Sequence, residues 1–216
     1  MKSQDIVVLL KLISMHQTFF PERGVGDKTL FLDGEYEGCS ESNYISEKVE
    51  HSDLPPPDID KRFSVRALAF ATGISKTQIS LSLQRMEQVG LQKLDRKLKL
   101  PKTNSKALLE FLAYGIRYVF PAKERELARG IATSIAAPVL KNKLMSAGEL
   151  VPVWSNAEGT TKGLSIEPLH PNVDKAISAD PRMYAFLALT DAIRLGNPRE
   201  RNLAIDMLAR LFRVNL

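Results

Sequence analysis

The chain has few residues of the kinds that build covalent, metal or membrane structures. Its 216 residues include one cysteine, Cys39, which excludes an intramolecular disulfide framework and fits a reducing cytoplasm. The three histidines are far apart, and none has a second ligand at metal spacing. The most apolar run, from Ile6 to Ile13, is far too short to span a bilayer, and no signal-peptide cleavage site comes after it. We therefore expect a cytoplasmic protein without a membrane association.

The sequence also lacks the motifs that mark an active site or a bound cofactor. The segment GVGDKT at Gly24 has neither the GK[ST] ending nor the preceding buried strand of a phosphate-binding loop. Cys39 lies in an acidic segment, with no neighbouring group that would activate its thiol. His170, in EPLHPNVD, is best interpreted as a turn residue, although a ligand role stays open. We expect no catalytic residue, no metal and no cofactor.

The most informative stretch is SVRALAFATGISKTQISLSLQRMEQVGL, which runs from Ser64 to Leu91. Its first half predicts a short helix that Ser64 caps and Gly73 ends, because glycine takes the left-handed conformation without strain. A second helix is predicted over 75–89, with an apolar stripe on one face and an acid-free polar face on the other. Two helices joined by such a turn are typical of helix-turn-helix readers of the DNA major groove. The alternative is an ordinary helical hairpin with a solvated face.

A basic segment, QKLDRKLKLPKTN, occupies residues 92–104. It holds five Lys or Arg against the single acid Asp95, and its spaced leucines predict a short twisted ribbon. In GISKTQISLSLQRMEQVGL and the basic ribbon after it, the chain resembles the winged helix-turn-helix transcriptional regulators of bacteria, especially the MarR-like group, over about residues 61–120. The resemblance implies a sequence-specific regulator, which we interpret as a repressor, acting as a homodimer on paired half-sites.

The second helix and the ribbon supply the expected contacts to double-stranded DNA. We expect the outer face of helix 75–89 to meet base edges, while the ribbon meets the backbone or the minor groove. The candidate DNA-binding residues are Thr77, Gln78, Ser80, Leu81 and Gln84 at base edges, Lys76 and Arg85 at flanking phosphates, and Lys93, Arg96, Lys97 and Lys99 in the ribbon.

The distribution of charge points to the same region. The whole chain carries a net charge of +5, whereas residues 61–130 hold fifteen Lys or Arg against five Asp or Glu, a surplus of ten. A cationic surface on one domain suits a polyanionic backbone, because each neutralised phosphate releases condensed counterion. A basic membrane-facing helix is the competing explanation, but the basic residues do not lie opposite a Trp/Phe/Leu-rich face in one continuous helix.

Residues 18–60 differ sharply in composition from the basic region on their C-terminal side. They contain eleven Asp or Glu against three Lys or Arg, together with the run Pro55-Pro56-Pro57. The alternation in TLFLDGEYEG predicts a hairpin that turns at Asp33-Gly34, and the remainder is interpreted as loop. We expect an acidic insertion within a DNA-binding domain of residues 1–120. It is either a flexible solvated loop or a flap that competes with DNA or contacts a partner.

Two further helices are predicted in this domain. The opening SQDIVVLLKLI is apolar in nearly all directions, so it must be covered on two sides. The expected covers are the helix-turn-helix core and either the C-terminal part of the chain or a second subunit. One long helix of about four turns is expected from Ser105 to Pro121, and its broad apolar arc would supply a dimer contact or a seam with the next domain.

Residues 121–216 do not match MarR-like proteins. Residues 129–144 are small and show no clear period, whereas GELVPVW and GLSIEPL predict the two strands of a hairpin. Two helices are predicted, over 181–195 and 198–214. Between them lies a charged cluster, interpreted as solvated ion pairs or, alternatively, as an anion contact at a helix N-terminus. The cluster consists of Asp191, Arg194, Arg199, Glu200 and Arg201.

The expected fold class is mainly α with a small β component, a winged helix-turn-helix domain followed by a C-terminal α+β module. That module would serve dimerisation or the binding of a partner or ligand. As an alternative, the architecture resembles bacterial antitoxins of the AbiEi type, which neutralise a nucleotidyltransferase toxin and repress their own promoter. The C-terminal half would then bind the toxin. A third hypothesis is a winged helix used only as a protein-binding scaffold, which would leave the basic surplus without an obvious purpose.

Overall fold

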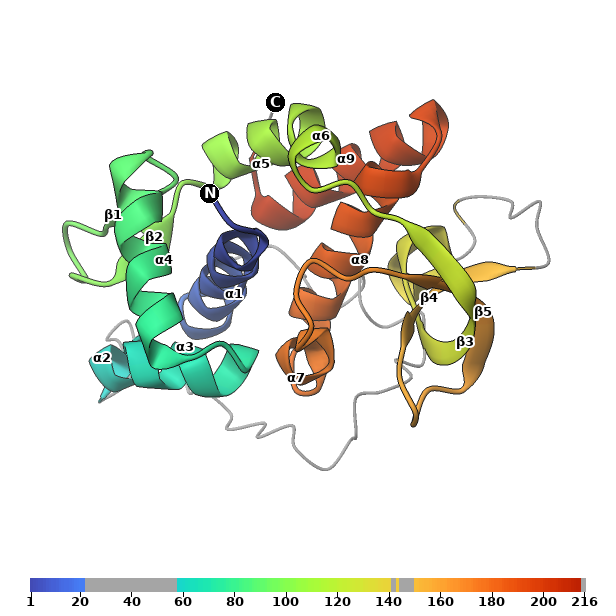
Figure 1. Ribbon diagram of the computed structural model, residues 1–216. Helices are drawn as coiled ribbons and strands as arrows, with labels where there is room; N and C mark the ends of the chain where they lie inside the picture. The colour runs from blue at the N-terminus through green and yellow to red at the C-terminus, as the bar shows by residue number, and fades with distance from the viewer. Residues whose placement is uncertain (22–57, 141–142, 144–149, 215–216) are drawn as a thin grey trace.

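The computed structural model describes residues 1–21, 58–140, 143 and 150–214. Within them the protein is mainly helical with a small β component, as the sequence predicts (Figure 1). The hairpin expected at Asp33-Gly34 and nearly all of the expected acidic insertion lie outside the described residues, as does Cys39.

Helix α1 (Ser3–Phe19) lies at the centre of the molecule (Figure 1). Every side chain from Ile6 to Leu10 is buried, so the helix has no free face in this stretch. Helices α3 (Val65–Thr72) and α4 (Lys76–Gln88) pack on one side of it, and α8 (Pro181–Leu195) packs on the other. The prediction of a helix covered twice is confirmed, and the second cover is the C-terminal part of the same chain.

Helices α3 and α4 begin and end at the residues that the sequence indicates. The Ser64 hydroxyl accepts a hydrogen bond from the Ala67 N–H at 3.2 Å, and the Ser75 hydroxyl accepts one from the Gln78 N–H at 3.4 Å. Gly73 ends α3 with a φ of 71°, a conformation that a side chain would strain. A single helical turn, α2 (Ile59–Arg62), precedes the pair.

Strands β1 (Gln92–Leu94) and β2 (Pro101–Thr103) form the antiparallel ribbon that the sequence predicts. The Thr103 hydroxyl donates to the Leu9 carbonyl at 2.9 Å, so the ribbon is attached directly to α1. His16 lies 2.9 Å from the Pro101 carbonyl, and burial lowers the pKa of its ring. His16 therefore holds the ribbon as a neutral donor.

The predicted long helix over 105–121 is wrong in one respect, because it is broken at Gly115. The chain forms α5 (Ser105–Tyr114) and then the single turn α6 (Ile116–Val119). A β-carbon at Gly115 would lie 3.1 Å from the Phe111 ring, so the break is packed against the preceding turn. Helix α5 packs on α9 (Pro198–Phe212) and α6 packs on α8, so these contacts form a seam with the C-terminal part.

The expected hairpin of β4 (Val151–Ser155) and β5 (Thr161–Ile166) is wrong, because the two strands run parallel. Each pairs antiparallel with β3 (Glu124–Ala132), a strand that the sequence analysis did not predict, and the three close into a small barrel (Figure 1). A β-carbon at Gly130 would collide with the Trp154 carbonyl. Glycine there permits the close approach of backbones that so small a barrel requires.

The chain leaves β3 through two 3-10 turns, η2 (Ser134–Ala136) and η3 (Pro138–Leu140). After the barrel, the short α7 (Val173–Ile177) leads into the two confirmed helices α8 and α9. Asn197 and Glu200 form the capping box at the start of α9, with Glu200 accepting from the Asn197 N–H at 2.9 Å.

The charged pair at the end of α8 is buried, so its interpretation as a solvated ion pair is wrong. Arg194 donates to Asp191 at 2.6 Å, and the two side chains are 3% and 2% exposed. Trp154 and Thr133 donate to the other Asp191 oxygen at 2.7 and 3.1 Å, while Arg194 also donates to the Phe120 carbonyl at 2.8 Å. Burial raises the pKa of Asp191, and these donors oppose that effect. The network joins α8 to the barrel.

Replacement of Asp191 by alanine tests how much this network stabilises the protein. Asp191→Ala leaves the Arg194 guanidinium buried without its counter-charge, so we expect the free energy of unfolding to fall by about 3–5 kcal/mol. Urea unfolding followed by circular dichroism measures the change. The matched control is Asp206→Ala on the exposed face of α9, which should change stability by no more than about 0.5 kcal/mol. Equal effects of the two substitutions would contradict the prediction.

Candidate nucleic-acid interface

The outer face of α4 points away from α1 and is open to solvent. Ile79 and Met86 are buried on the side of α4 that packs on α1. Residues about half a turn away from them lie on the opposite, outer face of the helix. Leu81 is 42% exposed, so an apolar side chain lies on this otherwise polar face. The exposed candidate residues on this face are Lys76, Thr77, Ser80, Leu81 and Gln84.

One acid lies on this face that the sequence analysis did not count. Glu87 is exposed in the last turn of α4, three residues after Gln84. Since residues three apart are neighbours on a helix surface, Glu87 lies beside Gln84 on the same side. The acid-free part of the face therefore runs from Lys76 to Gln84, and Glu87 marks its C-terminal limit.

Two of the candidate residues, Gln78 and Arg85, face α1. The Gln4 side chain donates to the side-chain amide oxygen Oε1 of Gln78 at 2.8 Å. Arg85 donates to Asp5 through two nitrogens, Nε at 3.1 Å and Nη2 at 2.5 Å. Gln78 and Arg85 lie two turns apart on the same side of α4, a spacing that could have indicated their shared partner. These contacts fix how α4 lies on the first turn of α1.

Asp5 is fully buried, whereas the Arg85 side chain is 27% exposed. Burial alone would raise the pKa of Asp5, but hydrogen bonds from Arg85 and from the Lys2 backbone N–H outweigh it and lower the pKa below its ordinary value. The pKa of Arg85 is raised, first of all by its hydrogen bond to Asp5. Both groups are therefore charged at neutral pH, and the pair acts as a charged clamp between α1 and α4.

The loop of the β1–β2 ribbon is held in shape by an acid at its base. Asp95 accepts hydrogen bonds from the backbone N–H groups of Lys97 and Leu98 at 2.9 and 3.0 Å, which lower its pKa. Lys99 adopts a left-handed conformation with a φ of 56° and closes the loop. The four basic candidates of the ribbon are all exposed, with no ion pair to another described residue: Lys93, Arg96, Lys97 and Lys99.

Two lysines lie directly opposite each other in the ribbon. Lys93 pairs with Lys102 across the two strands, and both are exposed. Like charges in this position destabilise a strand pair. Lys102 has partial compensation from Asp95 at 3.6 Å. A polyanion bound along the ribbon would relieve the repulsion between these two lysines.

Comparison of the chain with protein-family models, with curated proteins and with solved structures gives no match. Of the helices described, none is both long and apolar enough to cross a membrane. In residues 1–21, 58–140, 143 and 150–214, no three His, Cys, Asp or Glu side chains come together as potential metal ligands.

The clamp between Asp5 and Arg85 predicts a dependence of stability on pH. We expect Asp5→Asn to lower the free energy of unfolding by about 2 kcal/mol near neutral pH, the scale of hydrogen bonds to charged groups. Folding lowers the pKa of Asp5 below its ordinary value of 3.8. The contribution is therefore fully present above that pH and is lost as the pH falls through the lower folded-state pKa.

Urea unfolding of the wild-type protein and of Asp5→Asn over a pH series measures this difference. The gap between the two proteins should be constant near neutral pH and shrink on strong acidification. Asp206→Asn, at an exposed position on α9, serves as the control and should show no such gap. A gap that widens on acidification would contradict the assigned direction of the pKa shift.

Proposed function

We propose that the protein is a sequence-specific DNA-binding transcriptional regulator, a repressor, built on a winged helix-turn-helix. Helices α3 and α4 form the helix-turn-helix, and the β1–β2 ribbon is the wing. The proposal rests on one observation, that the open face of α4, which is free of acids from Lys76 to Gln84, is followed by an exposed basic ribbon attached to the same central helix. Such a pair offers base-edge contacts and phosphate contacts together.

Within this proposal the residues of α4 divide into two groups. The exposed Thr77, Ser80, Leu81 and Gln84 contact base edges, with Leu81 suited to a thymine methyl group. Gln78 and Arg85 act through α1 instead, because their side chains are bonded to Gln4 and Asp5. They position the recognition helix. Lys76, at the exposed start of α4, is suited to a phosphate.

The basic ribbon supplies the affinity that does not depend on sequence. Lys93 is exposed on β1, and Arg96, Lys97 and Lys99 are exposed in the loop that Asp95 holds in shape. Each phosphate that they neutralise releases condensed counterion, so binding should weaken steeply as salt rises. We further propose that two copies of the chain bind paired half-sites, as readers of this type commonly do.

Binding of the purified protein to the DNA upstream of its own gene, against a scrambled fragment of equal length, tests this proposal across a salt series. Tight, salt-sensitive and sequence-selective binding is the expected result, with two chains per site in a stoichiometric titration. Binding that is weak or indifferent to sequence would contradict it. The protein-binding hypothesis, including the antitoxin-like alternative, would then be favoured.

Two substitutions separate base reading from phosphate contact. Gln84→Ala should relax selectivity for the cognate fragment by about 1–3 kcal/mol, because a lost base-edge contact discriminates by that amount. Lys97→Ala should weaken binding to both fragments alike and reduce the salt slope by about one. Lys162→Ala, on the exposed side of β5, is the matched control and should leave both quantities unchanged. If neither Gln84→Ala nor Lys97→Ala changed binding, this docking mode would be wrong.

A further inference from the structure

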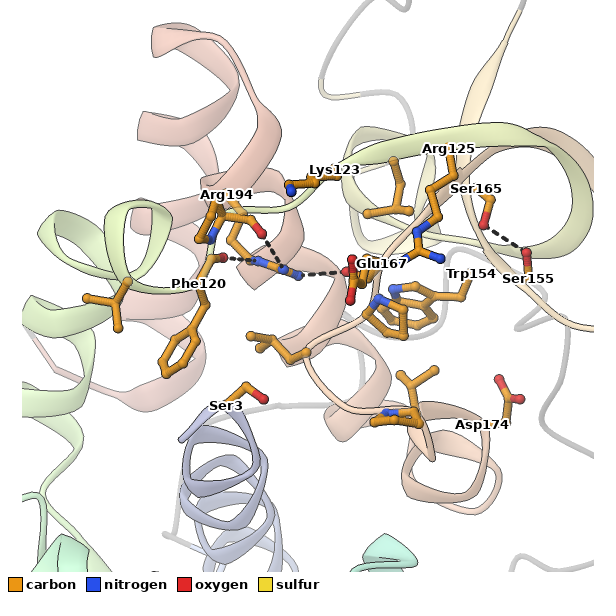
Figure 2. A pocket seen from close by; sticks show the side chains of 17 residues that line it. Ser3, Phe120, Lys123, Arg125, Trp154, Ser155, Ser165, Glu167, Asp174 and Arg194 are labelled. Carbon is orange, nitrogen blue, oxygen red and sulfur yellow. Dashed lines mark hydrogen bonds and ion pairs between the residues drawn. The ribbon is translucent and has the colours of Figure 1, made fainter. Parts of the chain in front are cut away.

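A cavity of about 660 Å³ lies where the C-terminal part meets the first turn of α1 (Figure 2). Its walls come from five segments of the chain, represented by Ser3 of α1, Val119 of α6, Trp154 of the barrel, Asp174 of α7 and Arg194 of α8. The volume lies in the range of pockets that hold small organic molecules. The DNA-binding function proposed above makes no use of this cavity.

The lining combines apolar surface with separated polar groups. Phe120 contributes aromatic surface and the buried Trp154 lies within the wall, while Lys123 and Arg125 bring positive charge (Figure 2). Arg125 is already paired with Glu167 at 2.8 Å, so its charge is largely compensated. Lys123 has no ion pair with another described residue, and it is the cation most available to a ligand.

Asp174 lies in the α7 wall of the cavity. One of its carboxylate oxygens is fully buried, so a molecule bound in the cavity does not reach it. Lys123 therefore decides the chemistry of the matching ligand, which is a small organic anion with an apolar body whose acidic group meets Lys123.

The walls of this cavity are connected to the recognition helix. Ser3 lines the cavity, and the next two residues, Gln4 and Asp5, bond to Gln78 and Arg85 of α4. A second connection runs through α7, because the Asn172 side chain, one residue before α7, donates to the Gly73 carbonyl at 2.6 Å. Both segments that hold the α3–α4 pair thus also form walls of the cavity.

From this geometry we infer that the cavity binds a small organic anion and that its occupancy displaces the first turn of α1, loosening the hold on α4. Its role as a signal input rests on the DNA-binding function proposed above. Coupling of this kind is reciprocal, so the anion would weaken DNA binding and DNA would weaken anion binding.

Anilinonaphthalene sulfonate is a suitable probe, because it combines an acidic group with an apolar aromatic body. Trp154 is the only tryptophan of the chain and lines the cavity, so energy transfer from Trp154 to the probe reports binding in the full-length protein. We expect saturable transfer. Val119→Glu and Lys123→Gln should each raise the dissociation constant about fivefold, the scale of one exposed charge interaction.

Matched controls keep this test specific. Tyr118→Glu introduces the same charge on the neighbouring residue of α6, outside the cavity lining, and Lys162→Gln removes a lysine from the exposed side of β5. Neither should change the dissociation constant. Absence of saturable transfer, or equal weakening by all four substitutions, would overturn the assignment of the cavity as a binding site.

Hydrogen exchange of the peptide that contains residues 76–88 tests the connection to α4 without using DNA. Saturating probe should speed its exchange in the wild-type protein and in Tyr118→Glu, and should have less effect in Val119→Glu. Binding without any change in this peptide would overturn the coupling. If binding and coupling were both observed but the protein failed to select its own upstream DNA, the proposed function would be wrong while the anion site would stand.

Discussion

Burial of α1 is the constraint on which the rest of the structure depends. A helix with apolar residues on every side loses about 1.5–3 kcal/mol for each large side chain left in water, so it must be enclosed. The α3–α4 pair encloses one side and α8 the other. Lys11 is the one charged residue in the apolar run from Ile6 to Ile13, and it is paired with Asp180 of the C-terminal part at 2.7 Å. Asp180 also caps α8, because it accepts a hydrogen bond from the Met183 N–H at 3.0 Å. One helix thus fixes the candidate DNA reader relative to the C-terminal part.

The second constraint lies at the other end of α8, where Asp191 and Arg194 are buried together. Each oxygen of the Asp191 carboxylate accepts at least one hydrogen bond, so the buried charge has hydrogen-bond donors as well as a counter-charge. Such a network stabilises one arrangement, because any displacement of the barrel would leave a buried charge without its partners. The barrel, α8 and α1 therefore behave as a connected frame.

Local signals in the sequence predicted the helices well. Ser64 and Ser75 cap their helices through their own hydroxyl groups, and Gly73 adopts the conformation expected of it. The features that were missed depend on partners distant in sequence. Strand β3 pairs with segments more than twenty residues away, and Asp5 meets Arg85 eighty residues later. Neither periodicity nor composition records such a pairing, which explains why the barrel and the clamp on α4 emerged only from the structure.

The contrast between apolar and polar contacts explains how α4 could respond to the cavity and stay attached. Ile79 and Met86 are the fully buried side chains on the inner face of α4, and they would stay buried after a small rotation of the helix. The bonds from Gln4 and Asp5 are directional, so the same rotation would break them. Their combined strength, about 2–4 kcal/mol on the usual scale, is comparable to the 1–3 kcal/mol typical of allosteric coupling. A disturbance confined to the first turn of α1 therefore has enough leverage to reorient α4 without unfolding it.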